Sequence, residues 1–291
     1  MNITITGSLG NISKPLTKKL VDAGHTVKVI SSNENNRAAI ESLGATAEIG
    51  SVEDVKFLVQ AFSGADVIYT MTPNNFAAEN PREYMNNVGR SYAEAIVKSN
   101  VHKVVNLSSI GADLADGTGP IKGLHDVEQI LNKLEDINII HLRAAYFYTN
   151  FYNDIPLIKN LGFTGSNFSA ETLMVMVHPQ DIATEIANQM EQGFEGKNFR
   201  YVYSDLQVAQ AVATTLGTAV GKPDLNWVQF TDEKALDGML QAGLPAPMAE
   251  NYVEMGNAMG NGLLSKDFNL HKPEAGITKI SDFAVEFAKR F

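Results

Sequence analysis

The residues most suggestive of chemistry lie in the first thirteen positions, where a short strand runs into two closely spaced glycines. Gly7 and Gly10 follow the β-branched stretch at residues 2–6, and a helix begins near Lys14. Gly7 permits a tight turn, and Gly10 lets a phosphate approach the N–H groups and positive dipole end of the helix. Ser13 replaces the usual third glycine and is small enough for close packing of helix and strand. The stretch predicts the first turn of a dinucleotide-binding βαβ unit.

The end of the second expected strand bears on which dinucleotide is bound. A site that prefers NAD usually carries an acidic residue there, which binds the ribose 2′-hydroxyl. Here the strand ends in Ser31 and Ser32, and Arg37 follows a few residues later. Hydroxyls and a guanidinium suit a 2′-phosphate, although Glu34 opposes it by charge and Arg37 could lie simply on a solvated helix. We expect NADP as the cofactor, with NAD as the alternative.

Three residues are candidate catalytic groups. His125 is one, because the unperturbed pKa of histidine lies near neutrality, although a histidine near a helix start is also typical of a surface or capping residue. Ser109 ends a strand beside Ser108, where hydroxyls can polarise a carbonyl or instead satisfy free backbone groups. Tyr146 could supply a proton, or its ring could only line a pocket. We predict catalytic roles for His125, Tyr146 and Ser109.

Composition excludes several classes of function. The 291 residues are 44% hydrophobic, enough for one large α/β domain or a domain with a small lobe. The net charge of −10, without a Lys/Arg run, argues against nucleic-acid binding. The absence of cysteine removes disulfides and thiolate chemistry, and no two of the six histidines have helical ligand spacing, so no metal site is predicted. No apolar run reaches the ~20 residues of a membrane span and no signal peptide is recognisable, so we expect a cytoplasmic protein.

The elements that must position these residues are clearest in the first half of the chain. Short apolar strands alternate there with longer helices, the pattern of a parallel, doubly wound sheet. We predict strands at residues 2–6, 26–30, 45–49, 64–69, 103–108 and 137–142, and helices at 14–24, 37–43, 52–62, 81–99 and 122–134. Ligands bind at the carboxyl ends of such strands, so the loops after them should line the site.

The second half is less regular. We predict helices at 147–161, 181–192, 206–220 and 249–262, a strand at 226–230 and a surface loop at 162–167. The expected fold class is α/β, a Rossmann-type doubly wound parallel sheet with a smaller C-terminal substrate lobe. Residues 1–145 would form the dinucleotide-binding core, and residues 146–291 would complete the sheet and form the lobe. Four methionines indicate either an adaptable apolar pocket for a flat substrate or ordinary core: Met71, Met248, Met255 and Met259.

Taken together, the motifs resemble the NmrA-like branch of the atypical short-chain dehydrogenases, to which type 2 quinone oxidoreductases are related. The resemblance spans essentially the whole chain. Its elements, in order, are the turn from Gly7 to Ser13, residues 104–112 at the fifth strand, Glu128, the set Leu142, Arg143, Phe147 and Asn150, residues 177–183, and parts of residues 230–252.

The resemblance implies a Rossmann core with a small substrate lobe and assigns residues to an NADP site. It implies that the pyrophosphate is held by Gly7, Ser8, Leu9, Gly10, Asn11 and Ile12. It also implies that Thr70, Met71 and Thr72 flank the nicotinamide-side ribose and that Ser108, Ser109 and Ile110 lie beneath the ring. Tyr146, Phe147 and Asn150 would sit at the mouth of the crevice.

The chain departs from the short-chain dehydrogenase pattern at the proton donor. Those enzymes place a Tyr four residues before a Lys, and the Lys lowers the pKa of the Tyr. Aligned on Glu128, these two slots are Pro120 and Leu124, and neither can transfer a proton. Lys122 and His125 are near enough in sequence that a small shift would bring one of them to the crevice.

Two functions therefore remain open. The first is an NADPH-dependent reductase of a quinone or other conjugated carbonyl, because hydride transfer to such a substrate needs mainly positioning and an apolar site. The second is a non-catalytic NADP(H)-sensing regulator that acts on a protein partner. A sugar-nucleotide epimerase ranks last, because epimerases depend on the Tyr–Lys pair.

Overall fold

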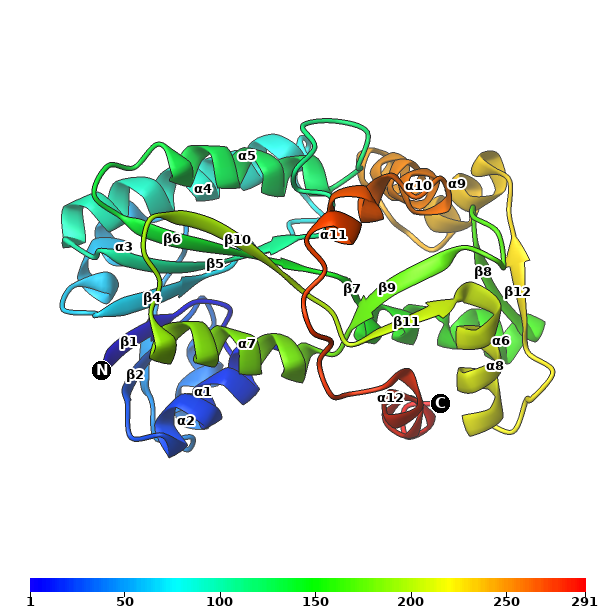
Figure 1. Ribbon diagram of the computed structural model, residues 1–291, viewed down its shortest axis with the longest axis horizontal. Helices are drawn as coiled ribbons and strands as arrows, with labels where there is room; N and C mark the ends of the chain where they lie inside the picture. The colour runs from blue at the N-terminus through cyan, green and yellow to red at the C-terminus, as the bar shows by residue number, and fades with distance from the viewer. The chain divides into compact units, whose positions relative to one another are not determined.

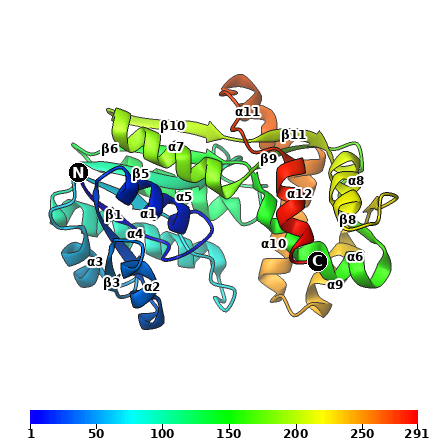
Figure 2. The ribbon, with the colours of Figure 1, turned by 90° about the horizontal axis from the view of Figure 1, so that it is seen from below.

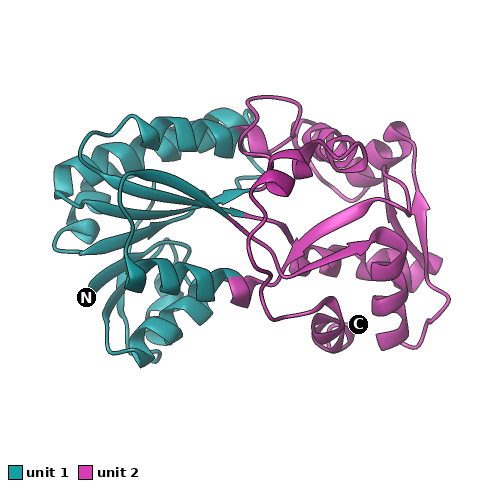
Figure 3. Cartoon of the chain, in the orientation of Figure 1, with its two compact units in different colours: residues 1–109, 123–143, 182–200 teal, residues 110–122, 144–181, 201–291 magenta.

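The computed structural model describes residues 1–291, which group into two units, each assembled from several segments of the chain (Figure 3). Unit 1 comprises residues 1–109, 123–143 and 182–200, and unit 2 comprises residues 110–122, 144–181 and 201–291. The expected division assigns residues 1–145 to cofactor binding and residues 146–291 to completion of the sheet and to the substrate lobe. That division stays a prediction.

A seven-stranded sheet organises unit 1, in the order β10-β6-β5-β4-β1-β2-β3. Its strands are β1 (Asn2–Ile5), β2 (Thr26–Ser31), β3 (Thr46–Ile49), β4 (Val67–Thr70), β5 (Lys103–Ser109), β6 (Asn138–Ala144) and β10 (Lys197–Val202). Because β1 pairs in parallel with both β2 and β4, the chain leaves β1 towards one edge and returns on its other side. The predicted doubly wound α/β fold is confirmed, and the six predicted strands lie close to their expected positions.

Helices cover both faces of this sheet (Figures 1 and 2). One face carries α3 (Val55–Phe62), α4 (Pro81–Ser99) and α5 (Ile121–Asn132), and the other carries α1 (Ser13–Asp22), α2 (Arg37–Glu41) and α7 (Pro179–Gln192). Phe62, Tyr92 and Val127 pack with strand residues Ile68 and Val104 in one buried cluster. The apolar faces of α3, α4 and α5 thus pack against one face of the sheet. This packing holds in place the strand ends from which the loops leave.

Unit 2 contains a three-stranded sheet of order β11-β9-β7 and a two-stranded sheet of β12 and β8. The strands are β7 (Tyr146–Phe147), β8 (Phe163–Ser166), β9 (Leu173–Val177), β11 (Asp205–Val208) and β12 (Asn226–Gln229). The helices of unit 2 are α6 (Ile155–Leu161), α8 (Ala209–Ala219), α9 (Asp232–Gln241), α10 (Ala246–Gly260), α11 (Lys266–Leu270) and α12 (Ile280–Ala288). Unit 2 also contains the 3-10 turns η2 (Tyr148–Asp154) and η3 (Leu263–Ser265), and unit 1 contains a third, η1 (Glu34–Asn36). Phe151, Met176, Leu216 and Phe283 belong to its buried core.

Three predictions for the second half are wrong. Residues 162–167, expected as a surface loop, contain β8, which pairs in parallel with β12. The expected helix at 147–161 begins instead as β7 and η2, and the expected helix at 206–220 begins as β11, which pairs with β9. In each case pairing with a distant strand overrides the local pattern. No helix is both long enough and apolar enough to cross a membrane.

Candidate functional site

The loop after β1 lies where the strand order of the sheet reverses, the position at which open α/β sheets bind ligands. Gly7 has a φ of +89°, and a Cβ added there would lie 2.5 Å from Ser13 Oγ. Ser13 Oγ donates a hydrogen bond to the Thr6 carbonyl over 2.8 Å, and the Gly10 N–H donates to the Gly7 carbonyl over 3.0 Å. Ser13 therefore does more than a third glycine would, because it ties the first turn of α1 to the end of β1.

The loop after β4 is joined to the loop after β1. Thr6 Oγ1 accepts the Met71 N–H over 2.9 Å, and the Tyr92 hydroxyl donates to the Met71 carbonyl over 2.7 Å. Thr72 is 8% exposed, and its hydroxyl has no hydrogen-bond partner in the protein. A buried hydroxyl without a partner is costly unless a ligand satisfies it, so Thr72 fits its predicted role beside a cofactor.

The start of α1 has the features that a dinucleotide phosphate requires. No side chain caps the helix, and its first turn contains no acidic residue. The free backbone N–H groups and the helix dipole therefore meet no competing carboxylate from this turn. In the predicted phosphate-binding run, Gly10 and Asn11 are exposed, Gly7, Ser8 and Leu9 are half-buried, and Ile12 is buried.

The end of β2 carries a polar cluster that includes one residue missed in the sequence. Ser8 Oγ donates to Ser31 Oγ over 2.9 Å, and Asn36 Nδ2 donates to Ser8 Oγ over 2.9 Å and to Ser31 Oγ over 3.2 Å. Ser31 is buried, whereas Ser32 is exposed. The run of three asparagines at positions 33, 35 and 36 gave no signal that Asn36 was the one to join this cluster.

Arg37, predicted to pair with a 2′-phosphate, already has a carboxylate partner. Its Nε lies 2.5 Å from Glu34 Oε1 and its Nη2 lies 3.0 Å from Glu34 Oε2. The hydrogen bond from Arg37 lowers the pKa of Glu34 below its usual value. Glu34 would therefore compete with a phosphate for this guanidinium.

Ser108 belongs to a buried ion pair at the end of β5. The Ser108 hydroxyl donates to Glu128 Oε1 over 2.6 Å, and Arg143 grips the same carboxylate with Nε–Oε1 and Nη2–Oε2 distances of 3.0 and 2.7 Å. The Arg143 guanidinium also stacks over the Phe199 ring, 4.2 Å from its centroid. The Ser108 hydroxyl therefore donates its hydrogen bond inside the protein. Ser109, the predicted catalytic serine, is half-buried.

A second buried polar chain occupies the strands below. Thr70 Oγ1 donates to Asn106 Oδ1 over 3.0 Å, and the Asn106 amide donates to His141 Nδ1 over 3.1 Å. His141 Nε2 lies 3.1 Å from Asn132 Oδ1, and burial lowers the pKa of His141 to about 4. The ring is therefore neutral near pH 7, and both of its nitrogens are engaged. The hydroxyl of Thr70, a predicted cofactor residue, therefore donates its hydrogen bond to Asn106.

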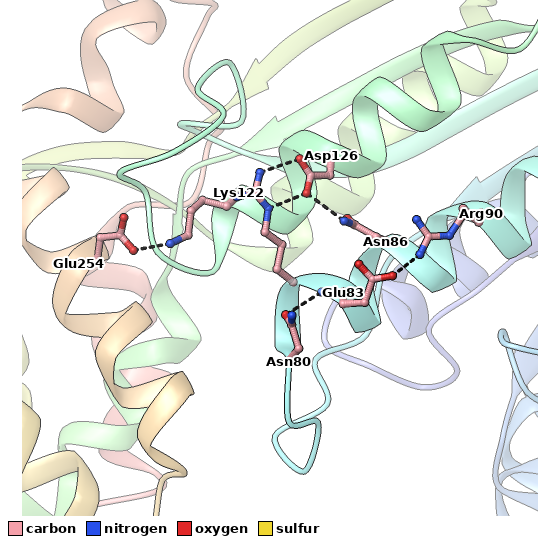
Figure 4. Close-up of polar contacts among 8 residues, drawn as sticks. Asn80, Glu83, Asn86, Arg90, Lys122, Asp126 and Glu254 are labelled. Atoms are coloured by element: carbon pink, nitrogen blue, oxygen red, sulfur yellow. Dashed lines mark hydrogen bonds and ion pairs between the residues drawn. The ribbon is translucent and has the colours of Figure 1, made fainter.

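The start of α5 contains no Tyr–Lys pair. Pro120 and Leu124 are half-buried, and Lys122 Nζ lies 2.6 Å from Glu254 Oε2 (Figure 4). His125 is half-buried on α5, and its catalytic role stays a prediction. The Lys122 ammonium is therefore engaged by a carboxylate within unit 2.

Four predicted residues belong to unit 2. Ile110 is buried, and its N–H donates to the Ala144 carbonyl over 2.9 Å. Tyr146, Phe147 and Asn150 are half-buried, and the Asn150 side chain hydrogen-bonds to the Tyr146 hydroxyl. Burial, followed by the nearby Asp154 and Tyr252, raises the pKa of Tyr146. Hydrogen bonds link Ser8, Ser31 and Met71 to their loops in unit 1, and the cofactor roles of the residues in both units stay predictions.

The methionines are divided between core and surface. Met248 is buried and Met259 packs against the core of unit 2, as the simpler of the two interpretations predicts. Met71 and Met255 are half-buried. No group of three or more His, Cys, Asp or Glu side chains is placed to hold a metal ion.

Comparison with curated proteins finds short matches. The chain is 33% identical over 78 residues to an uncharacterised protein of Schizosaccharomyces pombe, which is 26% of either chain. It is 28% identical over 67 residues to a sterol-4-alpha-carboxylate 3-dehydrogenase of Dictyostelium discoideum, covering 23% of this chain and 20% of that protein. The matches thus span about a quarter or less of the length of these relatives.

Solved structures match over nearly the whole chain. The NADPH-dependent quinone oxidoreductase of Escherichia coli, solved with NADPH, has a TM-score of 0.81 at 18% identity, covering 98% of this chain and 99% of that one. The triphenylmethane reductase of a Citrobacter species, solved with NADP(H), has a TM-score of 0.80 at 19% identity with the same coverage. A nucleoside-diphosphate-sugar epimerase of Staphylococcus aureus has a TM-score of 0.81 at 15% identity, covering 98% and 100%.

At these identities the neighbours show a common fold, and the predicted resemblance to the quinone oxidoreductase type of short-chain dehydrogenase is confirmed at that level. The sequence comparison identifies the cofactor class. A family model described as NAD(P)H-binding matches residues 7–136, which begin at the first glycine of the β1 loop and include α1, β2 and β4. The match to the NAD(P)H-binding family model thus covers the cradle at Gly7 and the uncapped helix beside it.

Proposed function

We propose that this protein is an NADPH-dependent reductase that transfers hydride to a flat, apolar conjugated carbonyl compound such as a quinone. The observation that carries the proposal is a dinucleotide cradle that lacks the Tyr–Lys pair, since Pro120 and Leu124 fill those slots and Lys122 pairs with Glu254. Reduction of an electron-poor ring can draw its protons from solvent, whereas alcohol and sugar chemistry depends on such a pair. The quinone oxidoreductase and triphenylmethane reductase neighbours support the same choice.

NADPH would supply the hydride when bound. The N-terminus of α1, with Gly7, Ser8, Leu9, Gly10, Asn11 and Ile12, would hold the pyrophosphate. Ser31, Ser32 and Arg37 would hold the 2′-phosphate, with Asn36 positioning Ser31 together with Ser8. Met71 and Thr72 would contact the nicotinamide side with Thr70 beneath them, and Ser108, Ile110, Phe147 and Asn150 would complete the site. NADP is proposed over NAD because no carboxylate bonds to the Ser8–Ser31 cluster.

The proposed catalytic residues are His125, Tyr146 and Ser109. Ser109 would polarise the carbonyl, while His125 or Tyr146 would donate the proton that accompanies the hydride. The location in the cytoplasm and the absence of a metal also stay predictions.

A non-catalytic NADP(H) sensor is the second candidate, and one observation favours it. The Ser108 hydroxyl, which would lie beneath the nicotinamide ring, donates to Glu128 and is not available to a substrate oxygen. Such a protein would bind NADPH and alter its contact with a protein partner without turnover.

The test is NADPH oxidation, followed by absorbance, against benzoquinones, naphthoquinones and enones at saturating cofactor. We expect turnover with at least one class and a loss with Gly7→Val, whose side chain meets Ser13 and Met71. NADPH binding without turnover on any of them would contradict the reductase and support the sensor.

A further inference from the structure

The loop after β1 contains two consecutive residues in the left-handed backbone region, and only the first is a glycine. Gly7 has a φ of +89° and Ser8 has a φ of +54°. Glycine adopts such angles without a steric cost, whereas a residue with a Cβ is strained there. A strained residue persists only where its surroundings hold it in place, so the contacts of Ser8 are informative.

Side chains at and after the end of β2 hold Ser8. Ser8 Oγ donates to Ser31 Oγ over 2.9 Å and accepts from Asn36 Nδ2 over 2.9 Å. Asn36 Nδ2 also donates to Ser31 Oγ over 3.2 Å, and the Ser8 N–H donates to the Ile30 carbonyl over 3.0 Å. Ser31 is buried, and Ser8 and Asn36 are half-buried. The Ser8 hydroxyl is thus fixed by two residues that lie 23 and 28 positions later in the chain.

The turn η1 brings Asn36 to this cluster. Asn33 caps the turn, since its Oδ1 accepts the Asn35 N–H over 3.0 Å, and its own N–H donates to Ser31 Oγ over 3.2 Å. Asn35 is exposed, whereas Asn36 is half-buried. Of the three asparagines, the first therefore caps η1, the second lies at the surface and the third reaches the loop after β1.

The conformation of Ser8 bears on the backbone N–H groups that follow it. The N–H groups of Ser8 and Gly10 donate to carbonyls of the protein, whereas those of Leu9, Asn11 and Ile12 do not. The last three lie just before α1, where the helix dipole favours an anion. Because the backbone angles of Ser8 set the direction of the chain after it, a Ser8 outside the left-handed region would turn these N–H groups elsewhere.

We propose that Asn36 is a positioning residue of the cofactor site, which holds Ser8 in the left-handed conformation and so keeps the three free N–H groups open to the pyrophosphate. Asn36 acts through Ser8 and does not itself contact the cofactor. Its amide suits this role because two N–H bonds can reach two hydroxyl oxygens at once. The inference rests on the proposed function only for the placement of the pyrophosphate on this loop, and it requires no turnover.

The test is a double-mutant cycle that measures NADH binding by fluorescence titration, because NADH has the pyrophosphate but lacks the 2′-phosphate. Asn36→Ala should raise the dissociation constant of NADH about five- to thirtyfold, the cost of a left-handed residue expressed as a ratio. NADPH should lose at least as much affinity. In a Ser8→Gly background, glycine adopts the left-handed conformation unaided. The same Asn36→Ala change should then raise the dissociation constant less than about twofold.

Asn35→Ala is the matched control, since it removes an exposed amide of the same turn and should leave both dissociation constants unaltered. A purely structural Asn36 would lower the free energy of unfolding, measured in urea, without weakening NADH binding, and that result would overturn the inference. So would a loss confined to NADPH, a loss of equal size in the Ser8→Gly background, or a wild-type protein that binds neither cofactor. Cofactor binding with the expected pattern but no turnover would refute the reductase and leave the role of Asn36 standing.

Discussion

Glu128 in unit 1 and Asp154 in unit 2 are both acids in poorly hydrated surroundings, and their partners differ. Glu128 receives two hydrogen bonds from Arg143 and one from Ser108, so its charge is balanced and both oxygens are satisfied. Asp154 receives one hydrogen bond from a neutral hydroxyl, and no cation acts on it. Glu128 therefore has a cationic and a neutral donor, whereas burial raises the pKa of Asp154 to about 7 and favours its neutral form.

The two acids differ in how many of their hydrogen-bonding sites the protein itself fills. A carboxylate whose two oxygens both accept hydrogen bonds inside the protein joins elements together, as Glu128 joins α5 to β5 and β6. A carboxyl with spare capacity is costly to ionise, and such groups cluster at functional sites. Glu128 belongs to the motif residues of the sequence and is engaged by Arg143 and Ser108, whereas Asp154 belongs to no motif and burial raises its pKa.

The largest expected effect comes from breaking the balanced pair. Arg143→Leu leaves the Glu128 carboxylate buried without its cation and removes the stack on Phe199. We expect the free energy of unfolding to fall by about 3 to 5 kcal/mol, measured by urea denaturation.

The double variant Glu128→Met/Arg143→Leu is the internal control, because it removes both charges and restores apolar packing. It should recover much of the lost stability. Arg90→Leu, in an exposed pair with Glu83, is the matched surface change and should have little effect. A loss below about 1 kcal/mol in Arg143→Leu would show that Glu128 is not held as described.

Asp154→Asn should have the opposite sign, and its effect should depend on pH. The carboxyl ionises near pH 3.9 in the unfolded chain but near pH 7 in the folded protein, so the wild type loses stability as pH rises from about 4 to 7. The amide avoids this loss. We expect the variant to match the wild type near pH 4 and to exceed it by up to about 4 kcal/mol at pH 8, the free energy that corresponds to the difference between the folded and unfolded pKa. Urea denaturation at the two pH values checks this, and a difference that is equal at both would contradict the neutral-acid assignment.

The sequence predicted the first half of the fold well, because its signals are local. The strand, turn and helix around Gly7 lie within twenty residues, and apolar runs such as Val67–Thr70 suit buried strands. β8 was missed because its strand character depends on Asn226–Gln229, some sixty residues later in the chain. Gly165, which suggests a loop in sequence, is needed there because a Cβ would lie 2.0 Å from the Val228 carbonyl oxygen.

For the candidate site, the sequence indicated residue types but not their partners. The Gly7 turn could be read directly, since a positive φ and close approach follow from glycine itself. That Ser108, Glu128 and Arg143 share one network is set by the packing of α5 on the sheet, which spacing alone does not reveal. Asp154 resembles any polar residue between an aromatic segment and a helix, and only burial gives it an unusual pKa.

An exposed Glu–Arg pair, Glu34 with Arg37, contains the same residue types as the buried Glu128–Arg143 pair. Glu34 and Arg37 form two hydrogen bonds like Glu128 and Arg143, yet both side chains are largely in water. Glu34→Gln should therefore leave stability almost unchanged, because exposed pairs contribute little. It should free the guanidinium for a 2′-phosphate and tighten NADPH binding about two- to fivefold, with no change for NADH. Glu94→Gln, which breaks an exposed pair with Lys98 on α4, is the matched control. Fluorescence titrations of both cofactors decide it: equal gains for NADPH and NADH would place Arg37 away from the 2′-phosphate.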